Sequence, residues 1–164
     1  MTIAEHLLRE IETEAQTTRK VLERVPVDKL SWKPHTKSMS LGQLAQHVAS
    51  TPGVIAASSI PDSYPVENFQ PEPTPASIDG ILKSLETSLA EARSVIAGLD
   101  DTRAMASWSM TAGGNPMLTM PRIDWLRIYM LNHWYHHRGQ LSVYLRELNV
   151  PVPAMYGPSA DENA

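Results

Sequence analysis

The sequence predicts an all-α fold, a four-helix bundle with one long crossover connection. Four stretches repeat apolar residues at intervals of three and four, which places those residues on one face of a helix. Prolines and glycines interrupt the chain between these stretches. The 164 residues, which include no cysteine, suffice for a single domain over 1–164 with a packed core and without disulfides.

The first helix is predicted over residues 2–24. Thr2 and Glu5 have the spacing of a capping box, and Pro26 ends the helix because proline cannot continue it. Trp32 lies in the linker that follows, and we expect it to dock on the bundle.

The second helix is predicted to begin at Ser40, which is a good N-cap residue. Pro52 and Gly53 predict a kink or an end, after which residues 54–57 resume the helix for a turn or two. Residues 59–77 are too rich in proline for a helix or a central strand, so they predict an extended crossover.

The third helix is predicted over residues 77–99 and the fourth over residues 121–148. Between them, a Gly113-Gly114 turn separates two short apolar runs, which predicts a small hairpin within residues 100–120. The last few residues are acidic, and we expect them to be disordered.

Histidines are concentrated in the fourth predicted helix. His133 and His137 are four residues apart, so they share one helical face, at positions where the stripe is otherwise apolar. Two neutral imidazoles on one face form half of a transition-metal site, and His47 on the inward stripe of the second helix is a third candidate ligand. The alternative is a metal-free bundle in which these histidines only donate hydrogen bonds in the core.

His133 and His137 have the spacing of the H-E-x-x-H motif of metalloproteases, but Trp134 stands where the catalytic glutamate would be, which argues against metalloprotease chemistry. Three protein ligands with one open position are typical of catalytic zinc rather than structural zinc. Ligand sets made only of imidazoles suit zinc, nickel, copper or iron.

Two segments give the chain a resemblance to a known family. Residues 41–47 (LGQLAQH) and 133–141 (HWYHHRGQL) resemble the DinB/YfiT-like superfamily of metalloenzymes, and the similarity covers almost the whole chain. The resemblance implies a homodimeric four-helix bundle in which His47, His133 and His137 hold a divalent metal. We expect zinc or nickel first, and iron or copper as alternatives. His136 matches a histidine of the family that is not normally a ligand, and it points in another direction on the helix.

Three neighbours of the histidines are further candidates for the site. Arg138 would bind an anionic substrate or, as the preferred alternative, buttress the helix or form a surface ion pair. Gln140 and Asn132 would orient ligand imidazoles or only link helices.

The resemblance also implies a reaction, thiol-dependent S-transfer to a small electrophile with a low-molecular-weight thiol as cosubstrate. Alternatives are a hydrolase that uses metal-bound hydroxide and a non-catalytic metal-binding stress-response protein. The formal charge of −4 and the absence of Lys/Arg runs argue against nucleic-acid binding. The sequence shows no signal peptide and no apolar run of the ~20 residues that span a bilayer, so we expect a cytoplasmic protein.

Overall fold

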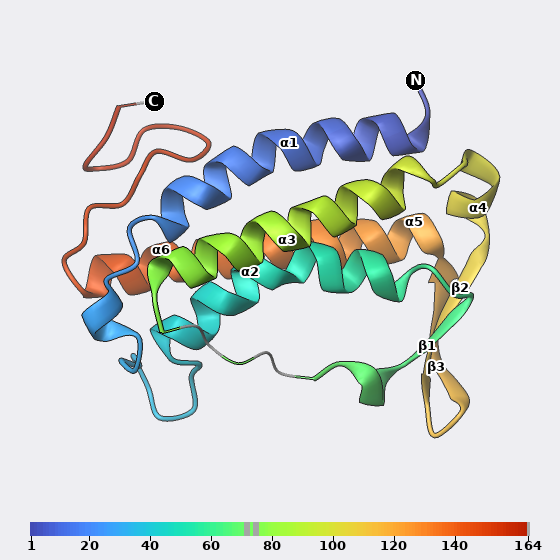
Figure 1. Ribbon diagram of the computed structural model, residues 1–164, viewed down its shortest axis with the longest axis horizontal. Coiled ribbons are helices and arrows are strands. Elements are labelled where there is room, and N and C mark those ends of the chain that lie inside the picture. The colour runs from blue at the N-terminus through green and yellow to red at the C-terminus, as the bar shows by residue number, and fades with distance from the viewer. Residues whose placement is uncertain (71–72, 74–75, 164) are drawn as a thin grey trace.

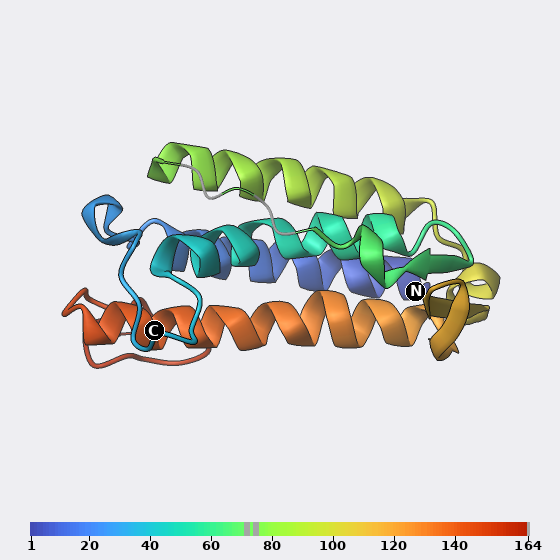
Figure 2. The same ribbon diagram turned by 90° about the horizontal axis from the view of Figure 1, so that it is seen from below.

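A computed structural model describes residues 1–70, 73 and 76–163 and shows four long helices with a small sheet at one end (Figures 1 and 2). The first three long helices are α1 (Ile3–Leu22), α2 (Leu41–Ser58) and α3 (Ile78–Ala97). The fourth consists of α5 (Arg122–Trp125), the π-helix η3 (Leu126–Asn132) and α6 (His133–Glu147), which follow one another without a break. Single turns η1 (Val27–Lys29) and η2 (Val66–Asn68) and the short helix α4 (Asp101–Met105) lie in the connections.

The long helices α2 and α3 run in the same direction, opposite to α1 and to the fourth helix (Figure 1). The chain between α2 and α3 therefore returns along the length of the bundle, as the predicted crossover requires. Part of that prediction, residues 71–72 and 74–75, lies outside the described residues.

The all-α prediction needs a correction, because the chain also forms a three-stranded sheet. The predicted hairpin is present as β2 (Ser107–Ala112) and β3 (Asn115–Pro121), with positive φ angles of 54° and 80° at Gly113 and Gly114 in the turn. The unexpected strand is β1 (Ser63–Pro65), which pairs in parallel with β2. A strand of three residues in a proline-rich segment is too short to show an alternation of polar and apolar residues, so this pairing could not be predicted from the sequence pattern.

Both predicted helix starts are capped as expected. The Thr2 hydroxyl accepts a hydrogen bond from the amide of Glu5, and Ser40 and Gln43 form the same reciprocal box at the start of α2. Trp32 packs edge-on against Tyr144 of α6, with ring centroids 5.5 Å apart. The linker between α1 and α2 is thus fixed on the bundle.

Helix α2 continues through Pro52, where the sequence predicted a kink or an end. Proline has no amide hydrogen, so the carbonyl four residues earlier, that of Val48, lacks its usual helical partner. The indole Nε1 of Trp134 donates to this carbonyl at 2.8 Å and replaces that hydrogen bond. The defect in α2 therefore links this helix directly to α6, next to His133.

Helices α2 and α3 approach each other closely at Gly53. A Cβ atom at Gly53 would lie 2.8 Å from the backbone Cα and O atoms of Ser88. The Ser88 hydroxyl accepts from the amide of Gly53 and donates to the carbonyl of Ser50, at 2.8 and 2.9 Å. Only a residue without a side chain allows this contact.

We expect the substitution Gly53→Ala to destabilise the protein by about 1–3 kcal/mol, because the added methyl group forces the two helices apart. Gly139→Ala is the matched control: a Cβ there meets no atom within 4 Å, so the gain in helix propensity should stabilise the protein by roughly 0.5–1 kcal/mol. Urea denaturation measures both effects. Equal effects of the two substitutions would contradict the proposed contact.

The start of the crossover is anchored by Arg122, which is only 1 % exposed. Its guanidinium donates to the carbonyls of Ser59 and Arg103 and to the carboxylate of Asp62, each at 2.7 Å. This anchor joins β1 and the end of α2 to the fourth helix, and it fixes the point from which the crossover returns.

The acidic C-terminal segment folds back over the bundle. Asp161 accepts hydrogen bonds from Arg146 at 2.5 Å and from the amide of Val152 at 2.9 Å. Glu162 pairs with Arg24 after the end of α1. The last residue, Ala164, belongs to the segment predicted to be disordered and lies outside the described residues. In the described ranges no helix combines the length and the apolar composition that a membrane span needs.

Candidate metal centre

Three histidines from two helices meet inside the bundle: His47 from α2, and His133 and His137 from the first two turns of α6. One ring nitrogen of each lies within 4.8 Å of the others. The Nε2 atoms of His47 and His133 are 2.9 Å apart, and the His137 ring lies 4.5 Å and 4.3 Å from these two rings. The spacing of the sequence and the packing of α2 on α6 together produce this group.

Burial keeps these imidazoles neutral. Desolvation, and then the neighbouring imidazoles, lower the pKa of His47 to about 4 and that of His133 to about 4. Desolvation also lowers the pKa of His137, against the opposite effect of its hydrogen bond to Gln140. Neutral imidazoles keep a nitrogen lone pair available at pH 7, which is the form that binds a metal.

The side chain of Gln140 orients one of the three rings. Its Oε1 atom lies 2.7 Å from Nδ1 of His137. An amide oxygen only accepts, so Nδ1 carries the proton and Nε2 is left with its lone pair. Gln140 thus has the position that the sequence suggested for a residue that orients a ligand imidazole.

We expect Gln140→Ala to weaken metal binding by about 10- to 100-fold while the fold is retained, because the tautomer and angle of His137 are then unrestrained. Competition with a coloured chelator measures the affinity. Gln43→Ala is the control, since the Gln43 side chain accepts from the amide of Ser40 at the start of α2 and not from an imidazole. An unchanged affinity of the Gln140 variant would contradict this role.

The other predicted neighbours lie outside the histidine group. Arg138 is 1 % exposed and makes an ion pair with Glu14 of α1, so it supports the helix from inside the bundle. Asn132 is exposed. His136 is also exposed and is not part of the group, although its ring centroid lies 5.0 Å from that of His137.

A π-helix directly precedes the metal-binding candidates on the fourth helix. The segment η3 ends at Asn132, and His133 is the first residue of α6. π-Helical turns are rare and occur frequently at functional sites. At the other end of η3, Trp125 stacks on Trp108 and on Tyr129, with centroids 4.1 and 4.3 Å apart.

A cavity of about 480 Å³ opens beside His47 and His133. Its lining is largely apolar and includes Met39, Val54, Ile55 and Phe69, with amide and hydroxyl groups between them. Among the described residues that line it, no side chain other than the histidines is ionisable. The volume is typical of a site for a small molecule.

Sequence reasoning did not identify Phe69 and Gln70 as part of this cavity. Both belong to the crossover, whose start is held by Arg122 and by the contact of Phe69 with Trp125, at 6.2 Å between ring centroids. The only signal in the sequence is that Phe69 is the single phenylalanine of the chain and lies in an otherwise polar, proline-rich segment.

The donor set fits a divalent transition metal. Three neutral imidazoles converge from two rigid helices, one of them is oriented by a hydrogen bond, and an adjacent cavity leaves room for a further ligand. This arrangement defines a helical-bundle protein with a three-histidine group that could hold a metal.

The family model for the DinB family matches residues 1–164. The chain therefore belongs to the DinB family, as its resemblance predicted. The uncharacterized protein YrdA of Bacillus subtilis (strain 168) is 26 % identical over 160 residues, which cover 96 % of this chain and 90 % of YrdA.

Solved structures with the same fold include two DinB-like proteins. The one from Bacillus cereus ATCC 10987 has a TM-score of 0.76 at 23 % identity and covers 94 % of this chain and 98 % of its own. The protein YjoA of Bacillus subtilis has a TM-score of 0.72 at 20 % identity and covers 92 % and 97 %. These likenesses support the overall fold of the chain.

Proposed function

We propose that this protein is a metal-dependent transferase that joins a small thiol to an electrophile. The observation that carries the proposal is the three-histidine group at the wall of a largely apolar cavity. His47, His133 and His137 would hold the ion, for which zinc and nickel are the first choices. The protein has no cysteine, so the thiol must be a separate cosubstrate.

A divalent cation held by His47, His133 and His137 would lower the pKa of a thiol bound next to it, so that the thiolate would form at neutral pH. In the transfer, the thiolate sulfur forms a bond to the electrophilic carbon and the leaving group departs with its electron pair, while the thiol proton goes to solvent. Apolar side chains such as Ile55 and Phe69 exclude water from the reacting sulfur. Gln140 keeps Nε2 of His137 unprotonated.

Hydrolysis is the second candidate reaction, and the lining of the cavity makes it less suitable. In the H-E-x-x-H metalloproteases a glutamate is the general base that activates the water at the metal. Within the described lining there is no Asp or Glu to take that role. A non-catalytic metal-binding role would instead require a fourth protein ligand that closes the open position.

The test is an assay of untagged protein, loaded with zinc or with nickel, on the model electrophile 1-chloro-2,4-dinitrobenzene. The thiols are 2-mercaptoethanol, cysteine and glutathione. We expect conjugation that depends on both metal and thiol, and that is lost with a chelator and in His137→Ala. Turnover without any thiol would instead favour hydrolysis, and no conjugation with any of the thiols would overturn the proposal. The homodimer and the cytoplasmic location stay predictions from the sequence.

A further inference from the structure

We propose that the groove between α2 and α3 is a second part of the same binding site, and that it binds the charged, non-reacting part of the thiol through Lys83. The inference rests on the proposed function, because it concerns the cosubstrate of that reaction. The groove takes no part in the chemical step and only binds the charged group of the thiol.

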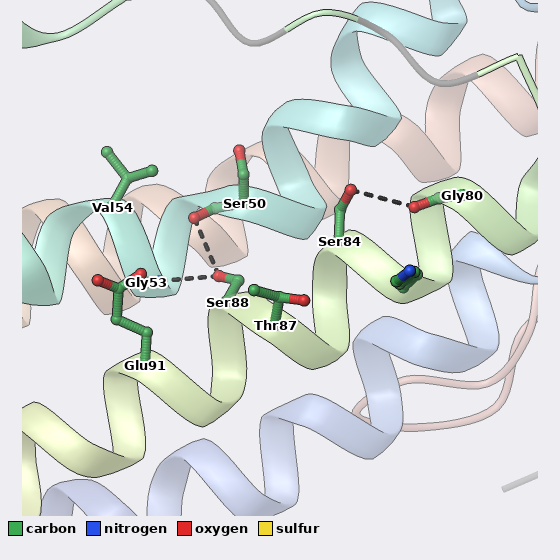
Figure 3. Close-up of a pocket in the computed structure, with 9 residues that line it drawn as sticks. Ser50, Gly53, Val54, Gly80, Ser84, Thr87, Ser88 and Glu91 are labelled. Carbon is green, nitrogen blue, oxygen red and sulfur yellow. Dashed lines mark hydrogen bonds between the residues drawn. The ribbon is translucent and has the colours of Figure 1, made fainter.

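The groove adjoins the histidine cavity along one edge of α2. It has a volume of about 290 Å³ and is lined by Ser50, Gly53 and Val54 of α2 and by residues of α3 (Figure 3). Ser50 and Val54 also line the histidine cavity, so the two spaces share a wall. Ser50 lies one helical turn after His47, which places the shared wall next to the candidate metal ligands.

The two spaces differ in charge. The described lining of the histidine cavity has no charged side chain, because its histidines are neutral, whereas the groove has Lys83 at one end and Glu91 two turns further along α3. In the described part of the chain, neither Lys83 nor Glu91 forms an ion pair, although many other surface charges do. These two groups are therefore available to a ligand.

The remaining polar groups of the groove hold the helices together. The Ser88 hydroxyl bonds to Ser50 and Gly53, and the Ser84 hydroxyl donates to the carbonyl of Gly80 at 3.1 Å (Figure 3). Thr87 and the two charged residues are exposed on the same side of α3. A ligand in the groove would thus contact the hydrogen-bonded backbone around Ser88, with Lys83 and Glu91 as the two charged side chains.

Small biological thiols derived from cysteine carry carboxylate and ammonium groups. Moving such a group into a neutral, largely apolar cavity costs free energy unless an opposite charge accompanies it. The groove offers that partner beside the cavity: Lys83 for a carboxylate, and Glu91 for an ammonium group. A thiol whose sulfur lies at the histidines would extend its charged part over Ser50 and Val54 into the groove.

The experiment measures thiol binding to the cobalt(II)-loaded protein from the sulfur-to-metal charge-transfer absorbance, without any turnover. The probes are glutathione, glutathione ethyl ester, which lacks one carboxylate, and neutral 2-mercaptoethanol. We expect glutathione to bind about fivefold more tightly than its ester to the wild type, and equally tightly to Lys83→Gln. The affinity for 2-mercaptoethanol should be the same in both proteins.

Two further variants separate the groove from the overall charge. Lys20→Gln removes the same charge from the exposed face of α1 and should keep the preference for glutathione. Thr87→Trp fills the groove without a change in charge. It should weaken the binding of glutathione but not the binding of 2-mercaptoethanol. Equal binding of glutathione and its ester to the wild type overturns the proposed groove and leaves the transferase intact. Absence of a thiol absorbance with every probe overturns both.

Discussion

Replacing His47 by alanine is expected to lower the affinity for zinc by at least about a hundredfold. A structural zinc site with four ligands binds with ~10–16 kcal/mol, which is about 2.5–4 kcal/mol for each ligand. A loss of about 3 kcal/mol corresponds to more than a hundredfold in affinity. The loss should be measured by competition with a chelator and by elemental analysis of untagged protein. The same substitution removes the group that lies 2.9 Å from His133, so the His133 ring loses its partner as well.

His136→Ala is the matched control for this prediction. His136 lies in the same helix and its ring is close to that of His137, but it is exposed and outside the group. We expect its removal to leave the metal content unchanged. If His47→Ala and His136→Ala retain equal amounts of zinc, the histidines are only packed in the core and the metal site is refuted.

Replacing Glu14 by alanine is expected to destabilise the protein by about 3–5 kcal/mol, because a buried charge then remains without its partner. The carboxylate of Glu14 accepts from the guanidinium of Arg138 at 2.5 Å, and both side chains are almost fully buried. Arg138 keeps the backbone carbonyl of residue 14 and the hydroxyls of Thr18 and Tyr156 as partners, but these are neutral groups and none of them balances its charge. Denaturation with urea measures the loss.

A second ion pair of α1 provides the control. Glu12 accepts from Arg93 at 2.6 and 3.0 Å, but this pair lies on the surface, so Glu12→Ala should cost less than about 1 kcal/mol. The double variant of Glu14→Leu with Arg138→Met should recover most of the stability lost in Glu14→Ala, since no unpaired charge remains. A cost for Glu14→Ala as small as that for Glu12→Ala would contradict the burial of this pair.

The sequence was a good guide where the pattern is local. The 3.6-residue period placed the four helices, the capping residues Thr2 and Ser40 marked the starts of the first two, and the spacing of His133 and His137 placed two imidazoles on one face. The double glycine also predicted the hairpin. In each case the residues that determine the structure are neighbours in the chain, so their spacing is sufficient evidence.

Contacts between distant segments could not be predicted in this way. The pairing of β1 with β2 joins residues more than forty positions apart, for example Ser63 and Ser109. The continuation of α2 through Pro52 depends on a hydrogen bond from Trp134, and the environment of Arg138 depends on Glu14 of another helix. His47 joined the group through its inward position and the family resemblance, because spacing within one helix says nothing about a partner helix.

The π-helix in the fourth helix has a consequence for how this protein can change. A π-helical turn contains an additional residue, and each residue corresponds to about 100° of helical rotation. The stretch before η3, with Trp125 in its aromatic stack, is therefore out of phase with the stretch that presents His133 and His137. The two parts of this helix therefore present their side chains to different neighbours. Trp125 contacts Phe69, which lines the histidine cavity, so substitutions in the aromatic stack should change that wall. The relative orientation of His133 and His137 should stay the same, because both lie in α6.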